Sequence, residues 1–298
     1  MTVHTLGLTP ALDIVYVLDE VRLGGIHRPP VVLRSAGGKS LNVARALTLL
    51  GVPARAIAPL GGRIGDLVAQ LLDERGVRVD RIPSAVETRM CVTASDTTAR
   101  TLTEFYEPVT EFDVPLAEIA QRTAQVQPGE WLTFSGAVPS AVDTRALAEL
   151  LAADVSRGVL LAVDVHGPAL GTILEVARPR LVKVNRSEAE ELTGLARRED
   201  AAAALLARGA GVAVVTDGEA GSFALAADGE RVSAPPVTRP GLFPVGSGDC
   251  YLAGLVAVLD AGGGLTAGLD AAAAVAAANA RVPGAAVFDV PPIAELVG

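Results

Sequence analysis

Residues 159–184 read VLLAVDVHGPALGTILEVARPRLVKV, and this stretch holds the pattern that decides the fold class. Two apolar runs, 159–164 and 181–184, have the composition of buried strands, and the segment between them has a helical pattern. The runs 131–135 and 212–216 are joined to helical patterns in the same way. This alternation predicts an α/β fold with a doubly wound, mostly parallel sheet that helices cover on both faces.

Two parts of the chain interrupt this alternation. Short β-prone pieces occupy residues 14–34, and residues 89–106 have the composition of a hairpin around a polar turn. We expect them to form a small β-sheet from about 13–35 and 88–107, which stands off the main domain as a lid over a site would. The chain from 1 to 298 is then a single α/β domain that carries a β lid.

The composition excludes several classes of protein. Half of the 298 residues are hydrophobic and the mean hydropathy is +0.41, yet no apolar run reaches the length of about 18 residues that a membrane span needs. The formal net charge of −9 argues against a nucleic-acid partner, since phosphate backbones are bound by clustered basic residues. Cys91 and Cys250 are too few for a disulfide framework. Without a basic leader at its N-terminus, the protein is expected to be cytoplasmic and to have no membrane partner.

A glycine turn before a helix carries the strongest chemical signal, within residues 243–255, FPVGSGDCYLAGL. The small residues Gly246, Ser247 and Gly248 let backbone N–H groups converge on one point, which the helix dipole makes attractive to anions. Asp249 beside such a point would repel an anionic ligand unless it takes up a proton there. The combination favours phosphoryl transfer to a hydroxyl, although an Asp in a first helical turn also serves as a plain cap.

A second glycine turn lies at residues 35–45, SAGGKSLNVAR, and contains the Gly-Lys-Ser that ends a nucleotide-binding P-loop. A P-loop needs a glycine five residues before Gly38, so that the backbone wraps the phosphates, but Leu33 occupies that position. The P-loop is therefore excluded. What remains is a lysine at a helix start, and Lys39 either holds a phosphate or carboxylate of a substrate or is an exposed side chain.

Polar residues follow the predicted strands at the edge of the sheet where such folds bind ligands: Ser135-Gly136, Asp164, Asn185 and Thr216-Asp217-Gly218. Asp13 lies in a turn after the first strand and is either a ligand for a hydroxyl or a solvated turn residue. Asn185 and Glu188 have the spacing of a capping box, and Glu188 is also a candidate for holding Mg²⁺ through water. Thr216 and Gly218 are candidates for contact with a phosphate, although a plain turn is equally consistent.

Several motifs together resemble the PfkB, or ribokinase-like, family of carbohydrate kinases over essentially the whole chain. They are Gly37-Gly38-Lys39, Asn42-Val43, Asn185 with Glu188, Thr216 with Gly218, and Gly246-Ser247-Gly248-Asp249. Within the family, the chain looks most like the branch that contains 1-phosphofructokinase and tagatose-6-phosphate kinase. Three features support this branch: Pro10 with Asp13, the run Glu87-Thr88-Arg89, and Pro244-Val245.

This resemblance implies a ribokinase-like core with a β lid, and transfer of the γ-phosphoryl group of ATP, with Mg²⁺, to a hydroxyl of a ketohexose phosphate such as fructose 1-phosphate, tagatose 6-phosphate or fructose 6-phosphate. It implies that Asp249 is the general base and that the backbone of Gly246, Ser247 and Gly248 forms the anion hole. The implied sugar contacts come from Asp13, Gly38, Lys39, Asn42 and Arg89, with Arg89 joining Lys39 on the phosphate of the substrate. The implied contacts with ATP and its metal come from Asn185, Glu188, Thr216, Gly218 and Asn279.

The chain departs from the family pattern at Thr9, Ser40, Met90 and Val184. Because Lys39, Arg89 and Asp249 are all present, these departures bear on the identity of the sugar more than on catalysis. Two other functions stay open: a kinase of an unphosphorylated sugar or nucleoside on the same fold, and a non-catalytic regulator that binds a sugar phosphate or nucleotide. A homodimer that forms through the lid is a further expectation.

Overall fold

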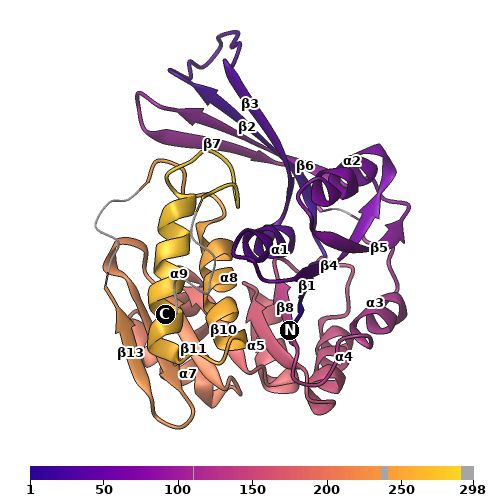
Figure 1. The fold of residues 1–298 in the computed structure, drawn as a ribbon, viewed down its shortest axis with the longest axis vertical. Coiled ribbons are helices and arrows are strands. Elements are labelled where there is room, and N and C mark those ends of the chain that lie inside the picture. The colour runs from indigo at the N-terminus through magenta and orange to yellow at the C-terminus, as the bar shows by residue number, and fades with distance from the viewer. Residues whose placement is uncertain (110, 236–240, 290–298) are drawn as a thin grey trace.

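The computed structural model describes residues 1–109, 111–235 and 241–289 of the chain. Nine strands in these ranges form a large sheet in the spatial order β13-β12-β11-β10-β9-β8-β1-β4-β5 (Figure 1). The pairings from β5 across to β11 are parallel, and β12 runs antiparallel to both of its neighbours. The strands are β1 (Val3–Leu6), β4 (Ala54–Gly61), β5 (Arg78–Ser84), β8 (Trp131–Ser135), β9 (Leu160–Asp164), β10 (Leu181–Asn185), β11 (Val212–Thr216), β12 (Ser222–Ala226) and β13 (Arg231–Ala234).

Helices cover both faces of this sheet. One buried cluster holds strand side chains together with α1 (Lys39–Leu49), α2 (Gly62–Asp73), α8 (Ser247–Asp260) and α9 (Leu265–Asn279). The other cluster holds α3 (Leu116–Thr123), α4 (Thr144–Ser156), α5 (Pro168–Ala177), α6 (Arg186–Thr193) and α7 (Arg198–Ala207). Successive residues of a strand point to opposite faces, and in β11 Val214 joins the first cluster while Ala213 and Val215 join the second. The predicted doubly wound α/β fold is confirmed.

A small sheet projects from one end of the main body (Figure 1). Its four strands among the described residues have the order β3-β2-β6-β7, and the pair β6–β7 is the antiparallel hairpin that the sequence predicts. The strands are β2 (Ala11–Leu18), β3 (Val31–Gly37), β6 (Arg89–Asp96) and β7 (Thr101–Tyr106). They come from the same stretches of chain as the predicted β lid. Movement of this sheet as a lid stays a prediction.

Two exclusions made from composition can be compared with the described part of the chain. Within it, no helix is both long enough and apolar enough to cross a membrane. Cys91 and Cys250 are buried free thiols, as the sequence predicts. A short 3-10 turn, Gly218–Ala220, follows β11 and is the remaining helical element of the described residues.

Candidate active site

The candidate residues gather at the carboxyl edge of the large sheet, beside the position where the strand order reverses. From β1 the order runs outward through β4 to β5, and on the other side of β1 it runs through β8, β9 and β10. Open α/β sheets bind ligands beyond the carboxyl ends of the strands at such a reversal. Side chains from α1, α8 and the ends of β9 and β10 meet here through the contacts described next.

The glycine turn forms the start of α8. Gly246 has φ 77, a left-handed conformation that side chains disfavour, and Ala285 packs where a Cβ of residue 246 would stand. The amide of Cys250 donates to the carbonyl of Gly246 at 2.9 Å and so begins the helix. The amides of a first helical turn lack partners within the helix, and they form the positive end of the helix dipole. The turn is therefore built to attract an anion.

Asp249 lies in the first turn of α8 and is 6% exposed. Its Oδ2 accepts a hydrogen bond of 2.8 Å from Nδ2 of Asn42, which is on α1. Burial raises the pKa of Asp249 to about 7, and the negative charge of Asp164 acts in the same direction. The Lys39 ammonium and the Asn42 hydrogen bond limit this rise in the pKa. A carboxyl group whose pKa is near neutrality is suited to take up a proton and release it again.

Two ammonium groups converge on one carboxylate beside this turn. Asp164, at the end of β9, is fully buried, and its two oxygens each accept a hydrogen bond of 2.8 Å, one from Lys39 and one from Lys183. Burial alone would raise the pKa of Asp164, but the Lys183 and Lys39 ammonium groups bring the pKa below its ordinary value. The Lys183 Nζ lies 2.9 Å from where a Cβ of Gly248 would stand. The positive charges therefore face the anion-attracting end of α8.

A mostly apolar cavity of about 170 Å³ adjoins the same turn. Its lining comes from the end of β11, from β12 and from α8 and α9: Thr216, Gly218, Gly221, Ser222, Pro235, Ser247, Gly248, Tyr251, Ala273 and Ala276. The hydroxyl groups of Ser222 and Tyr251 are 2.6 Å apart and hydrogen-bonded. An apolar slot with glycine backbone at one end suits a flat base whose phosphates reach the helix start. Thr216 and Gly218, which the resemblance assigns to contacts with ATP, both line this cavity.

A model described as "pfkB family carbohydrate kinase" matches residues 5–291. The chain belongs to this family. Solved structures agree with the assignment of the fold. The chain is 24% identical in sequence to phosphofructokinase-2 from Escherichia coli, solved in complex with substrates and products. The TM-score is 0.89, and the match covers 99% of this chain and 97% of that chain. The tetrameric inhibited form of the same enzyme is 25% identical, with a TM-score of 0.85 over 95% of each chain.

A third structure, of a possible 1-phosphofructokinase from Thermotoga maritima, is 23% identical, with a TM-score of 0.83 over 100% of this chain and 97% of that chain. The protein is thus a carbohydrate kinase of the pfkB family with neighbours among the phosphofructokinases, as the sequence motifs predict. Membership of a carbohydrate kinase family implies that it uses ATP.

The pfkB chain uses Asn185 and Glu188 as a reciprocal cap of α6. Glu188 N donates to Asn185 Oδ1 at 2.9 Å, and Asn185 N donates to Glu188 Oε2 at 2.8 Å. The other oxygen of Glu188 lies 3.6 Å from the Lys39 ammonium. Glu188 can therefore cap the helix and still contact a ligand, because one carboxylate oxygen accepts from Asn185 and the other faces the Lys39 ammonium.

Asn279, which the resemblance assigns to contacts with ATP, has several hydrogen-bond partners within the protein. The side chain is fully buried, and its Nδ2 donates to the Val245 carbonyl at 2.8 Å and to the Ser247 hydroxyl at 3.1 Å. Its Oδ1 accepts from the amide of Ala286 at 2.8 Å. Asn279 thus supports the glycine turn, and Ala273 and Ala276 of α9 line the apolar cavity beside that turn.

The predicted sugar side is formed by the start of the small sheet and the start of α1. A Cβ at Gly37 would collide with the carboxylate of Asp13, so this residue has to be glycine. Burial raises the pKa of Asp13 to about 6, while the charges of Arg45 and Arg89 and the Gly38 amide act in the opposite direction. Asn42 Oδ1 is buried and has no hydrogen-bond partner among the described residues. A polar atom left bare in this way is ready to accept from a substrate hydroxyl.

Arg89 and Lys39, which the resemblance places on one substrate phosphate, contact different groups of the protein. Lys39 binds Asp164 at the end of β9 and Glu188 on α6, whereas Arg89 Nη1 donates to the carbonyl of Glu107 at 3.0 Å. The reason is electrostatic, because a buried carboxylate such as Asp164 needs ammonium partners. Lys39 and Arg89 are the two residues that the resemblance places on the sugar phosphate. Of these, Arg89 has a buried Nε that lacks a hydrogen-bond partner among the described residues.

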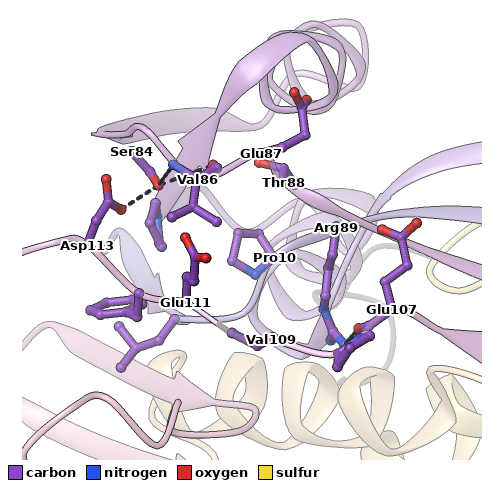
Figure 2. A pocket seen from close by; sticks show the side chains of 14 residues that line it. Pro10, Ser84, Val86, Glu87, Thr88, Arg89, Glu107, Val109, Glu111 and Asp113 are labelled. Atoms are coloured by element: carbon purple, nitrogen blue, oxygen red, sulfur yellow. Dashed lines mark hydrogen bonds between the residues drawn. The ribbon is translucent and has the colours of Figure 1, made fainter.

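Figure 2 shows a further cavity beside Arg89, with a volume of about 170 Å³. Arg89 and Glu107 lie at one end of it, and Ser84 and Asp113, which are joined by a hydrogen bond of 2.6 Å, lie at the other. Four carboxylates line the cavity: Glu87, Glu107, Glu111 and Asp113. Three of these carboxylates accept hydrogen bonds from backbone amides and so hold the loops around the cavity. The pairs are Glu87 with Ile64, Glu107 with Met90, and Asp113 with Ala85.

Lys183 lies in the candidate site and is not predicted from the sequence. Asp164 is predicted only as a polar residue at the end of a strand. Lys183 lies inside an otherwise apolar strand, where a charge needs a buried partner. A second signal is compositional: Lys39 and Lys183 are the only lysines in the sequence. In a chain that otherwise uses arginine for positive charge, both lysines bind the same carboxylate, and an ammonium group is a more compact point charge than a guanidinium.

Proposed function

We propose that the protein transfers the γ-phosphoryl group of ATP to a hydroxyl of a ketohexose phosphate, with Asp249 as the general base. The observation that carries this proposal is the environment of Asp249. The carboxyl group is buried at the start of α8, it is held by Asn42 from the sugar side, and its pKa is raised to about 7. An acid beside an anion site contributes nothing to binding alone, whereas proton transfer needs it there.

The chemistry follows from what each group can donate or accept. The sugar hydroxyl would donate its proton to Asp249 as its oxygen attacks the γ-phosphorus, and Asn42 Oδ1 would accept from a neighbouring hydroxyl. Charge on the transferring group would be met by the α8 amides and the ammonium groups of Lys39 and Lys183. Phosphoryl transfer depends mainly on such positioning and charge stabilisation.

Glu188 fits the role of holding Mg²⁺ through water. One of its oxygens lies only 3.6 Å from Lys39 and the carboxylate is 17% exposed, whereas both oxygens of Asp164 are already bound to ammonium groups. No group of three or more His, Cys, Asp or Glu side chains in the described ranges is arranged to hold a metal. Mg²⁺ commonly keeps its waters and binds substrate phosphates, where it would neutralise their charge.

A phosphorylated sugar is supported by the bare, buried Nε of Arg89 and by the names of the similar structures, which are phosphofructokinases. One observation favours a second candidate, a kinase of an unphosphorylated sugar or nucleoside. The cavity beside Arg89 is lined by four carboxylates, which repel a phosphate placed among them. The two candidates differ in whether Arg89 meets a phosphate.

The test is release of ADP from ATP with a panel of fructose 1-phosphate, fructose 6-phosphate, tagatose 6-phosphate, ribose and adenosine. Turnover with one of the three sugar phosphates supports the proposal and identifies the substrate. Turnover with ribose or adenosine alone replaces it by the second candidate. Stabilisation against heat by ATP without any turnover would make the protein a regulator that binds nucleotide.

Replacing Arg89 tests the phosphate contact. Arg89→Ala should raise KM for the sugar phosphate by about tenfold to a hundredfold with a smaller change in kcat, because a hydrogen bond between charged groups is lost. Steady-state kinetics with the sugar varied measure the effect. Arg100→Ala, at an exposed site in the turn between β6 and β7, is the control and should leave KM unchanged. Equal KM values for wild type and Arg89→Ala would remove Arg89 from the phosphate.

The small sheet is also proposed to form a homodimer contact. Leu23, Ile26 and Phe105, on or beside its strands, are exposed by 101%, 83% and 62%, and such apolar surface favours association. Light scattering should give twice the chain mass of 30.4 kDa for wild type and the single mass for Phe105→Glu, because burying an unpaired charge opposes association. Leu195→Glu, away from this sheet, is the control. A single mass for wild type would refute the dimer.

A further inference from the structure

Arg45 is a buried cation that the proposed chemistry does not use. It lies on α1 and is 3% exposed, and its guanidinium donates two hydrogen bonds to backbone carbonyls. Nη1 donates to Ala36 at 2.8 Å, and Nη2 donates to Ala286 at 3.1 Å. Residues 36 and 286 are far apart in the sequence, so a single side chain joins two distant segments at the site.

One of these segments carries the sugar side. Ala36 belongs to the last part of β3 and directly precedes the Gly37-Gly38 turn, which packs on the Asp13 carboxylate. The charge of Arg45 also lowers the pKa of Asp13 against the effect of burial, so the guanidinium and this carboxylate are electrostatically coupled. The guanidinium therefore fixes the backbone that leads into the predicted sugar contacts.

The other segment supports the glycine turn of the phosphoryl side. The amide of Ala286 donates to Asn279, and Asn279 donates to the Val245 carbonyl and the Ser247 hydroxyl. The neighbouring Ala285 packs against Gly246. The loop around residue 286 is thus held by Arg45 on its carbonyl side and by Asn279 on its amide side. A displacement of this loop would be transmitted to the turn that carries Asp249.

The energetic cost of this arrangement has to be offset by specific contacts of the guanidinium. Burying a guanidinium is expensive, and burial is the main reason that the pKa of Arg45 falls to about 10. An apolar side chain of similar volume would avoid that cost, but it would leave the carbonyls of Ala36 and Ala286 without the donor that Arg45 supplies. What an apolar side chain cannot do is donate to two carbonyls in a fixed planar geometry. The guanidinium therefore fixes the spacing of the two carbonyls.

We propose that Arg45 is a positioning residue that sets the glycine turn and Asp249 against the sugar side of the site. Asn42 and Arg45 are three residues apart on α1, so they share a face of that helix. Asn42 holds the Asp249 carboxylate directly, and Arg45 holds the loop beneath the turn. The inference rests on the proposed role of Asp249, but the guanidinium itself touches neither substrate.

Arg45→Lys and Arg45→Met test this role by two measurements. In the first, kcat should fall by about tenfold to a hundredfold with KM for ATP and sugar changed by less than about threefold, since a misplacement of about 1 Å costs up to a hundredfold in rate. In the second, amide hydrogen exchange of residues 243–249 should accelerate in the free variant. This exchange is measured without ligands, so it does not depend on the identity of the sugar.

Arg157→Met is the matched control. Arg157 also donates to two backbone carbonyls, those of Thr123 and Val126 at 3.2 Å each, and it binds Asp154 at the end of α4. Its loss should lower the melting temperature without changing exchange at 243–249 or kcat per folded molecule. If Arg45→Met does not fold, Arg45→Lys carries the test, because it keeps the charge and loses the paired geometry.

The outcomes separate this inference from the proposed function. Unchanged exchange at 243–249 in the folded Arg45 variants, or the same acceleration in Arg157→Met, overturns the positioning role while sugar kinase activity stands. Faster exchange in the Arg45 variants alone, in a protein that turns over no sugar of the panel, supports the link from Arg45 to the turn and refutes the proposed function. Faster exchange together with the selective loss of kcat supports both.

Discussion

Asp249→Asn lowers kcat by about two to four orders of magnitude and leaves the affinity for ATP nearly unchanged. The magnitude is that of a lost general base, because an amide has the shape of the carboxyl group but cannot take up the proton of the attacking hydroxyl. The amide can still accept the hydrogen bond of 2.8 Å from Asn42, so the turn keeps its support. Steady-state ADP release and ATP titration by calorimetry measure the two quantities.

The control for this variant is Asp154→Asn. Asp154 is also a buried carboxylate, but it lies on α4 and pairs with Arg157, away from the glycine turn. The variant Asp154→Asn should lower the free energy of unfolding and leave kcat nearly unchanged. Near-normal turnover by Asp249→Asn would mean that another group takes the proton, and Asp249 would then only be an acidic residue that suits the dipole at the start of α8.

Lys39→Met lowers kcat by about a hundredfold to a thousandfold and changes KM for the sugar little. This expectation follows from the contacts of Lys39 with Asp164 and Glu188, which place its ammonium beside the glycine turn and the nucleotide side. Loss of a group that stabilises charge developing in the transition state acts on kcat. Loss of a contact with the phosphate already on the sugar would instead raise KM.

Kinetics with each substrate varied in turn distinguish these two roles of Lys39. Arg145→Met is the control, since Arg145 is an exposed residue of α4 that pairs with Glu149. A large rise in KM for the sugar with an unchanged kcat would return Lys39 to the sugar phosphate, as the family resemblance implies. It would also show that the pairing with Asp164 gives way when substrate binds.

The sequence predicts most of the architecture because the large sheet is built from buried parallel strands. Runs such as 159–164 and 212–216 are nearly all apolar, so the alternation with helices is plain. The strand β5 is harder to find, since Arg78–Ser84 is largely polar and contains a proline, as suits an edge strand. The same holds for β13, a four-residue edge strand that begins with an arginine.

The sequence predicts those parts of the candidate site whose residues lie in one local motif. Prediction fails for residues that are brought together by tertiary packing. The glycine turn and Asp249 are read from adjacent residues. Lys183 and Asp164 meet because β9 and β10 are parallel neighbours, and the pairing of Val182 with Val163 brings the next residues side by side. The partners of Asn279 depend on how α9 packs beneath the turn, which no spacing in the sequence reveals.

The role of Asp249 as general base can be measured in the pH dependence of kcat/KM for the sugar. Because burial and Asp164 raise the pKa of Asp249 to about 7, the base is ionised above that pH, and the rate should rise through about pH 7 and then level off. Ionisation of Asp13, whose pKa is about 6, adds a second rise of kcat/KM near that pH, because its carboxylate is the form that accepts from a sugar hydroxyl. The account predicts that Asp249→Asn loses the limb near 7 and keeps the lower one. A limb near 7 that survives in Asp249→Asn would contradict it.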